Sequence, residues 1–125
     1  MDADVDPDFR FEDPHPIRVQ KGGLAPGDTI AQGNSVTILV AAPGISTLHA
    51  RARITGTTAD LDVVRKLADG KTDANDQPTT VNLADGTADI LSASADGCAV
   101  FEVTLTNTGA GPDVTIDYLD LFPVF

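Results

Sequence analysis

The strongest structural signal in the chain is TTVNLADGTADILSASADGCAVFEVTLTN, residues 79–107. It contains two Asp-Gly pairs, Asp85-Gly86 and Asp96-Gly97, each flanked by short runs in which apolar residues alternate. Asp-Gly readily adopts the positive φ angles that a two-residue hairpin turn of type I′ requires. The stretch therefore predicts three neighbouring antiparallel strands joined by two tight turns.

The two turns also predict which residues face one another. Counting outward from each turn pairs Val81 with Ile90 and then Ile90 with Val103, so that three apolar side chains form one row. The same count gives a second row of Leu83, Ala88 and Leu105. A slip of one residue would turn the whole face outward, so the agreement of both turns predicts one shared apolar wall.

The rest of the chain continues the β pattern, because runs rich in Val, Ile, Leu and Thr alternate with Gly, Asp and Asn turns. A short helix at 59–70 is the one alternative, although β-branched residues and alternation favour a strand there. We predict an all-β fold, an antiparallel, jelly-roll-like β-sandwich of seven to eight strands within residues 34–125. The expected strands are 35–42, 46–55, 59–67, 78–84, 87–94, 98–107 and 113–121.

Residues 1–33 predict a different kind of segment, an extended acidic arm. Pro and Gly recur in DPHP, KGG and APGD, which block a sustained helix or strand. Residues 1–16 carry six acids and one base, which is typical of a tail that stays disordered until a partner orders it. Phe9 and Phe11 alternate within it and predict addition of the arm to the edge of a neighbouring sheet.

The opening MDADVDPDFRFEDP allows a second interpretation, a calcium loop. Asp2, Asp4 and Asp6 match the first, third and fifth positions of an EF-hand loop, and Asp13 matches the twelfth. The sixth position requires Gly for a sharp turn but holds Pro7, whose φ is fixed negative. A solvated tail is therefore favoured, with weak binding of a divalent ion left open.

The loop at 68–78 gathers further oxygen donors, which are common in solvated turns as well as in Ca²⁺ sites. These donors are Asp69, Asp73, Asn75 and Asp76. We expect a solvated loop here, with a divalent-ion site left open as the alternative, and we assign no metal ligand and no cofactor.

A basic stripe lies in STLHARARIT, residues 46–55, where His49, Arg51 and Arg53 share one face of the predicted strand. A turn at 56–57 would form two cross-strand ion pairs that help set the register. That register places Arg53 opposite Asp60, Arg51 opposite Asp62 and His49 opposite Val64. A partner-binding strip and a catalytic role remain as alternatives.

The chain ends in VTIDYLDLFPVF, residues 114–125, which is apolar on both faces of a predicted strand. Alternation puts Ile116 and Tyr118 on one face and Leu119 and Leu121 on the other, and we expect Pro123 to stop the ladder. Because this segment is so apolar, we expect it to dock either on the protein's own core or on a second subunit. The residues predicted to bind a partner are Phe9, Phe11, Leu119, Phe122, Val124 and Phe125.

Composition limits the partners. Nineteen acids against eight bases give a formal charge of -11, which argues against binding to nucleic acid or to an anionic membrane. No apolar run approaches the roughly 18 residues of a membrane span, and the first residues lack the basic start and apolar stretch of a signal peptide. The single cysteine, Cys98, is expected to be a buried or half-buried strand residue.

The sequence also lacks the signatures of an enzyme. There is no Ser-His-Asp set beyond chance, no Cys-His pair in a sensible context, no glycine-rich phosphate loop and no zinc spacing. The paired carboxylates of a glycosidase stay open as an alternative. A carbohydrate cleft would bring Trp or several Tyr, whereas Trp is absent and Tyr118 is the only tyrosine. We therefore predict a protein that is not an enzyme.

The order of parts, an acidic arm MDADVDPDFRFEDPHP followed by a disulfide-free sandwich from Ser35 to Leu121, resembles the small decoration or cement proteins of tailed bacteriophages. The resemblance implies a virion structural protein that is made in the host cytoplasm, forms homotrimers and reinforces a capsid through its arm and C-terminal strand. The alternative is a carbohydrate- or receptor-binding β-module of a fibre or spike. A small hydrolase is the third class.

Overall fold

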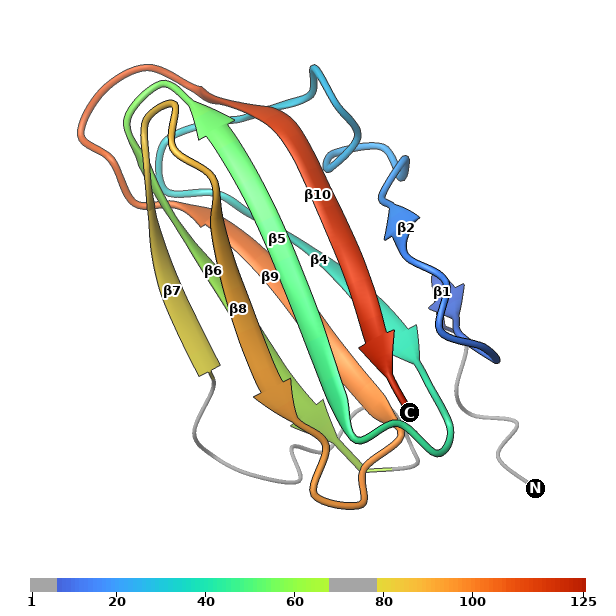
Figure 1. Cartoon of the computed structure of the whole chain (residues 1–125). Coiled ribbons are helices and arrows are strands. Elements are labelled where there is room, and N and C mark those ends of the chain that lie inside the picture. Colours follow the sequence, from blue (N-terminus) through green and yellow to red (C-terminus); the bar gives the residue numbers. More distant parts are fainter. Residues whose placement is uncertain (1–6, 68–78) are drawn as a thin grey trace.

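The structure, a computed structural model, describes residues 7–67 and 79–125, which form two β-sheets packed face to face (Figure 1). The first sheet has the order β1-β4-β9-β6-β7 and the second β2-β10-β5-β8, with β3 also paired to β10. The first sheet consists of β1 (Phe9–Arg10), β4 (Ser35–Ala41), β9 (Val100–Asn107), β6 (Thr58–Lys66) and β7 (Thr79–Ala84). The second consists of β2 (Ile17–Arg18), β3 (Thr29–Ile30), β10 (Val114–Val124), β5 (Thr47–Thr55) and β8 (Asp89–Ser94).

The predicted fold class is confirmed. The seven longer strands lie at the predicted places, and 59–70 begins as a strand rather than a helix. The long strands pair antiparallel, and successive ones usually change sheet in the jelly-roll manner, whereas β1 pairs parallel with β4. No helix in the described ranges is long and apolar enough to cross a membrane.

The core lies between the sheets and is built by period-two alternation. In β6 the residues Ala59, Leu61 and Val63 point inward, and the acids between them are half-buried. The largest side chains that lose all contact with solvent include Phe101, Leu48, Leu61, Leu83 and Leu119. Both sheets thus contribute their inner faces to one continuous apolar layer.

The predicted three-strand wall is wrong in its pairing. β7 pairs with β6, which puts Val81 opposite Leu61, and β8 pairs with β5, which puts Ile90 opposite Arg51. Val103 lies in β9 between β4 and β6. Val81, Leu83, Val103 and Leu105 do face the core, but Ile90 is 46% exposed and Ala88 is exposed as well.

The error has a physical cause in the connections. Both Asp-Gly pairs reverse the chain, but the two positive φ angles of a type I′ turn occur at Asp96 and Gly97, 46° and 85°, and not at the first pair, where Gly86 has φ 71° and Asp85 has no positive φ. Each turn, however, carries the chain from one sheet to the other rather than to the neighbouring strand. Leu91 and Ala93, not Ile90, are therefore the inward residues of β8.

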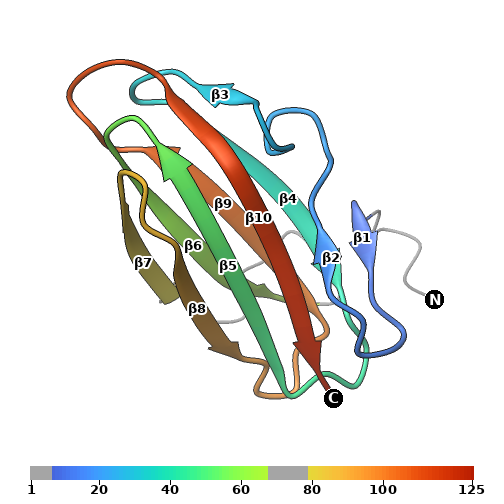
Figure 2. The same cartoon turned by 45° about the horizontal axis from the view of Figure 1, so that its top comes forward.

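Residues 7–33 are not a separate tail, and this corrects the expectation of a disordered or partner-ordered arm over residues 7–16. The segment runs along the sandwich and pairs with it through β1, β2 and β3 (Figure 2). Phe11, Val19, Leu24 and Ile30 are all buried in the common core. The apolar residues of the arm are therefore part of the folding unit.

Two polar contacts hold the arm in place. The Asp8 carboxylate accepts hydrogen bonds from Lys21 Nζ at 2.7 Å and from the Leu39 backbone N–H at 2.8 Å, which ties the arm to strand β4. The buried Asn107 side chain donates to the Ile30 carbonyl at 2.9 Å and so joins β3 to the end of β9. Both contacts satisfy backbone groups that a loosely attached arm would leave to water.

Strand β10 departs from the predicted alternation. The register shifts between Ile116 and Tyr118, so Asp117 is the extra residue of a β-bulge. Ile116 is therefore buried on the same side as Leu119, and the prediction that Ile116 and Tyr118 share a face is wrong. Pro123 does not stop the ladder either, because it lies opposite Leu48 and the strand continues to Val124.

The two candidate calcium loops are not described by the structure in full, and Cys98 lies outside the strands. Asp2, Asp4 and Asp6, and the donors of the loop at 68–78, lie outside the described residues. Cys98 is half-buried, as expected, but lies just after the Asp96-Gly97 turn rather than within a strand.

Candidate functional site

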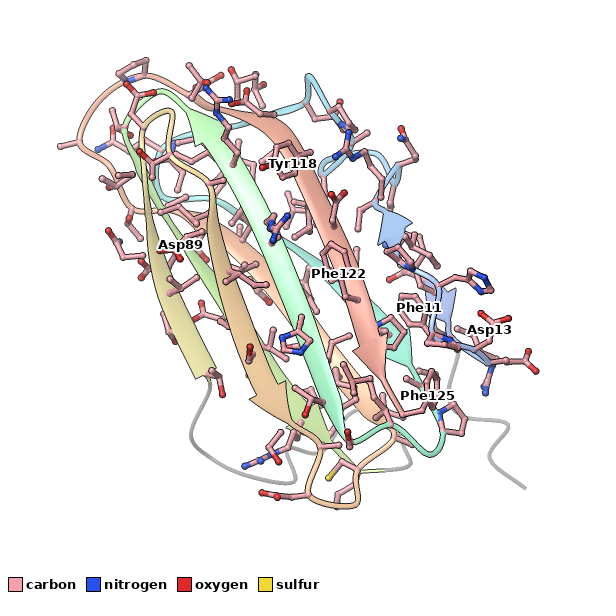
Figure 3. All side chains as sticks on the ribbon, viewed as in Figure 1. Phe11, Asp13, Asp89, Tyr118, Phe122 and Phe125 are labelled. Atoms are coloured by element: carbon pink, nitrogen blue, oxygen red, sulfur yellow. The ribbon has the colours of Figure 1, made fainter. Side chains whose placement is uncertain are left out.

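The outer face of the second sheet combines aromatic, basic and apolar side chains. In β10 the inward residues Leu119 and Leu121 are buried, so Tyr118, Asp120 and Phe122 stand on the opposite side. Figure 3 shows Tyr118 and Phe122 on the front of β10, along the same strand. We call this surface, formed by the outward residues of β10, β5 and β8 together with Arg18, the aromatic face.

The bulge at Asp117 creates the aromatic pair. Without an extra residue, Tyr118 would follow the inward phase of Ile116; the register shift sends it outward, in phase with Phe122. Residues four apart on a strand are separated by about 13 Å, so the two rings can contact different parts of one extended ligand. Bulges commonly re-aim side chains next to functional sites.

The basic stripe lies on the aromatic face, but with partners other than those predicted. Arg53 pairs with Asp117 at 3.3 Å between Nε and Oδ2, so the predicted Arg53–Asp60 and Arg51–Asp62 pairs are wrong. The Gly56-Thr57 link places β5 and β6 in opposite sheets. Asp60 instead accepts a hydrogen bond from Asn82, and Asp62 accepts one from Thr80.

Arg18 extends the aromatic face from the arm. Its guanidinium donates two hydrogen bonds to the Asp120 carboxylate, at 2.8 and 3.0 Å, and its Cζ atom lies 4.8 Å from the centre of the Tyr118 ring. The hydrogen bond to Asp120 raises the pKa of Arg18. Sequence reasoning missed this contact because 102 positions separate the two partners and no local pattern links them.

His49 also has a fixed place in the sheet. It lies between Phe122 of β10 and Ser92 of β8, not opposite Val64 as predicted. Its Nδ1 atom and the Ser92 hydroxyl share a hydrogen bond at 2.7 Å. This contact holds the imidazole ring on the face and engages one of its two nitrogens.

A shallow hollow forms where the three strands meet. It has a volume of about 220 Å³ and is lined by His49, Arg51, Ile90 and Phe122. The Arg51 Cζ atom lies 5.6 Å from the centre of the Phe122 ring, within the range of a cation–π contact. Ile90 could not be assigned to this surface from the sequence, because the predicted register placed it in the core.

The predicted partner-binding residues separate into two groups. Phe11 and Leu119 are buried in the protein's own core, and Phe9 packs against that core, so in this structure they are not presented to a partner. Phe122 is half-buried on the aromatic face, while Val124 and Phe125 are 42% and 45% exposed at the end of the chain. That these exposed residues bind a partner stays a prediction.

The aromatic face is equipped to bind a ligand by contact. It offers two aromatic rings for stacking and guanidinium and imidazole groups for hydrogen bonding. Within the described ranges, His, Cys, Asp and Glu form no group of three or more that could hold a metal ion.

Comparison with known proteins adds information on the fold. No family model and no curated protein matches the sequence. Among solved structures, the chain resembles part of tripeptidyl peptidase 2 at a TM-score of 0.69 and 10% identity, covering 95% of this chain and 11% of that one. It also resembles an insecticidal delta-endotoxin from Bacillus thuringiensis at a TM-score of 0.50 and 20% identity, covering 88% of this chain and 24% of that one.

A third similar structure matches along nearly its whole length. The xylan-binding module CBM15 aligns at a TM-score of 0.50 and 13% identity, covering 89% of this chain and 97% of that one. The chain thus spans only a small part of the peptidase and of the toxin, but it is similar in extent to the xylan-binding module. At these identities the likeness shows a shared β-sandwich fold.

Proposed function

We propose that this protein is a carbohydrate-binding module that holds an oligosaccharide across the aromatic face. The observation that carries the proposal is the pair Tyr118 and Phe122, set on one side of β10 by the bulge at Asp117. Phe122 thereby supplies a second aromatic ring beside Tyr118, in a protein that has no Trp and no other Tyr.

Sugar chemistry fits this surface. A pyranose ring has faces of C–H groups and a rim of hydroxyls, and the C–H faces stack on the electron-rich face of an aromatic ring. Tyr118 and Phe122 are far enough apart to contact different sugars of one chain. Arg51, Arg53 and His49 lie beside them on β5, where their nitrogen atoms can hydrogen-bond to the hydroxyl rim.

The likeness to a xylan-binding module is consistent with this proposal but does not carry it. Fold alone does not specify function, because β-sandwiches serve many unrelated roles. The support from the comparison is that a sandwich of this extent serves as a binding module in that protein. The residues of the aromatic face support the proposed function independently of the fold.

The virion structural role expected from the sequence stays a prediction. It depended on the C-terminal strand and on an arm whose aromatic residues order only on assembly, whereas in a single chain Phe11 is buried in the core and Phe9 packs against it. No feature of the described residues favours a capsid contact over the aromatic face. That the protein has no enzymatic activity and forms trimers also stays a prediction.

The test is direct binding of neutral oligosaccharides to the purified protein. Xylohexaose, cellohexaose and mannohexaose are titrated by calorimetry into the wild type and into Tyr118→Ala and Phe122→Ala. We expect at least one sugar to bind and each variant to lose about tenfold or more in affinity. The guide is the stacking of a nucleic-acid base on an aromatic side chain, which is worth roughly 1–3 kcal/mol.

Phe125→Ala is the matched control, because Phe125 is an exposed aromatic residue beyond the end of β10. It is expected to bind as the wild type does, and thermal melting shows whether each variant is folded. Absence of binding to all three sugars, together with a trimer that forms at higher protein concentration, would refute the proposal and favour the virion role. Equal weakening by all three substitutions would place the binding site elsewhere.

A further inference from the structure

The hollow of the aromatic face differs from the rest of that surface in size and lining. Its volume of about 220 Å³ is smaller than the roughly 300–1,000 Å³ of sites that enclose a drug-sized ligand, so it suits a single ring. Phe122 and Ile90 provide apolar surface, and Arg51 and His49 provide polar groups. Ile90 is unusually exposed for a large apolar side chain, which a ligand ring resting on it would cover.

Arg51 is the arginine of this face whose charge is not matched by an acid. Arg18 engages both oxygens of Asp120, and Arg53 pairs with Asp117. Asp120 lies opposite Arg51 across the ladder, but its carboxylate is already held by Arg18. In the described part of the chain Arg51 has no hydrogen bond or ion pair, and its contact is with the Phe122 ring.

His49 adds a second polar group to the hollow, and its hydrogen bond to Ser92 holds the imidazole ring in place. Its Nδ1 atom is engaged by Ser92, and Nε2 has no hydrogen-bond partner among the residues that the structure describes. The hollow therefore holds one unmatched cation and one imidazole nitrogen beside an aromatic ring. A carboxylate matches this set, because the guanidinium fork binds both carboxylate oxygens at once.

We propose that the hollow is a subsite for a carboxylate-bearing sugar ring, a uronic acid. The inference rests on the proposed carbohydrate-binding function and specifies one sugar of the ligand. The carboxylate pairs with Arg51, while the ring contacts Phe122 and Ile90. The rest of the oligosaccharide then runs along β10 toward Tyr118.

Net charge limits what kind of acidic glycan fits. The protein carries a formal charge of -11, and Asp117 and Asp120 lie on the same face, so a ligand with many charges is repelled at long range. One carboxylate placed against one unmatched guanidinium avoids most of that repulsion. We therefore infer a largely neutral glycan with occasional uronic acid residues, rather than a polyanion.

Single-ring probes test the subsite without depending on the rest of the glycan. Methyl β-D-glucuronide, methyl β-D-glucoside and the methyl ester of the glucuronide are each titrated into ¹⁵N-labelled protein and followed by NMR. We expect the glucuronide to bind about tenfold more tightly than the other two, with shifts at His49, Arg51 and Phe122, because a charge-assisted hydrogen-bonded pair is lost in each of them.

Two variants complete the test. Arg51→Gln is expected to abolish the preference, so that the variant binds the glucuronide no more tightly than it binds the glucoside. Arg10→Gln, the same substitution on β1 in the other sheet, is expected to leave both unchanged. Sodium acetate provides a carboxylate without a ring, and it is expected to bind far more weakly than the glucuronide.

Each failure has a distinct meaning. Equal binding of glucuronide and glucoside, unaffected by Arg51→Gln, would overturn the acidic subsite while leaving the carbohydrate-binding function intact. Shifts located away from the hollow, or no shift with any single-ring probe, would overturn the subsite too. Failure of the proposed function is recognised separately, by the absence of binding to all three neutral hexasaccharides.

Discussion

Ile90 and Leu91 are adjacent in sequence but lie on opposite sides of β8. Ile90 is 46% exposed and lines the hollow, whereas Leu91 is 3% exposed and belongs to the core. The hairpin register expected from the Asp-Gly turns makes the opposite assignment, with Ile90 in the apolar wall. The two residues therefore distinguish the observed sheet pairing from the predicted one.

Substitution of each by alanine provides the test. Leu91→Ala is expected to lower the free energy of unfolding by about 2–5 kcal/mol, because it opens a cavity in the core. Ile90→Ala is expected to cost less than about 1 kcal/mol, as is usual for exposed positions. Denaturant unfolding of both variants measures the difference, and a larger loss for Ile90→Ala would contradict the pairing of β8 with β5.

At the scale of the elements, the connections decide the topology. Gly56 lies in the link from β5 to β6 with φ 137°, and an added Cβ atom would lie 2.8 Å from the Asp113 carbonyl oxygen. The backbone therefore requires glycine at this point for two reasons, its conformation and the space beside it. This link carries the chain from the second sheet to the first.

Gly56→Ala is expected to destabilise the protein by about 1–3 kcal/mol, the cost of a strained backbone residue. Gly22→Ala is the control, since no atom lies within 4 Å of the Cβ position there, and it is expected to change stability by less than about 0.5 kcal/mol. Thermal or chemical unfolding compares them. Equal stability of the two variants would show that the link tolerates a side chain.

The elements themselves could be predicted from the sequence, but their partners could not. All seven long strands follow from alternation and turn residues, which are local signals. Whether a turn such as Asp96-Gly97 joins neighbours or crosses between sheets depends on contacts distant in sequence. For the same reason the stripe of His49, Arg51 and Arg53 was recognisable, whereas the contributions of Arg18 and Ile90 to the site were not.

The arm provides a further prediction at this scale, one that depends on pH. Burial raises the pKa of Asp8, but the hydrogen bonds from Lys21 and from the Leu39 N–H, together with the charge of Lys21, outweigh it, so the pKa lies below its ordinary value of 3.8. A lowered folded-state pKa contributes stability that is complete above the unfolded-state value and is lost as the pH falls through the folded-state value.

Asp8→Asn is therefore expected to be less stable than the wild type at pH 7, and the difference is expected to shrink as the pH falls below about 4. Denaturant unfolding of both proteins between pH 7 and pH 2.5 measures it. A difference that stays constant over this range would show that the charge of Asp8 does not hold the arm to β4.

At the scale of the whole molecule, the two outer faces differ in chemistry. On the first sheet polar side chains bond to one another across strands, as in Ser35 with Thr106 and Thr37 with Thr104. On the second sheet the aromatic face carries two rings, an unmatched arginine and a hollow. This asymmetry favours a protein that binds its ligand on one side.

The most direct test maps the bound ligand on the folded chain. ¹⁵N-labelled protein is titrated with xylohexaose, cellohexaose and mannohexaose in turn, and the amide shifts are assigned to residues. We predict that a bound sugar shifts residues of β10, β5 and β8 around Tyr118, Phe122 and His49, and leaves the outer face of the first sheet unchanged. Shifts confined to the first sheet, or none with any of the three sugars at millimolar concentration, would contradict a binding site on the aromatic face.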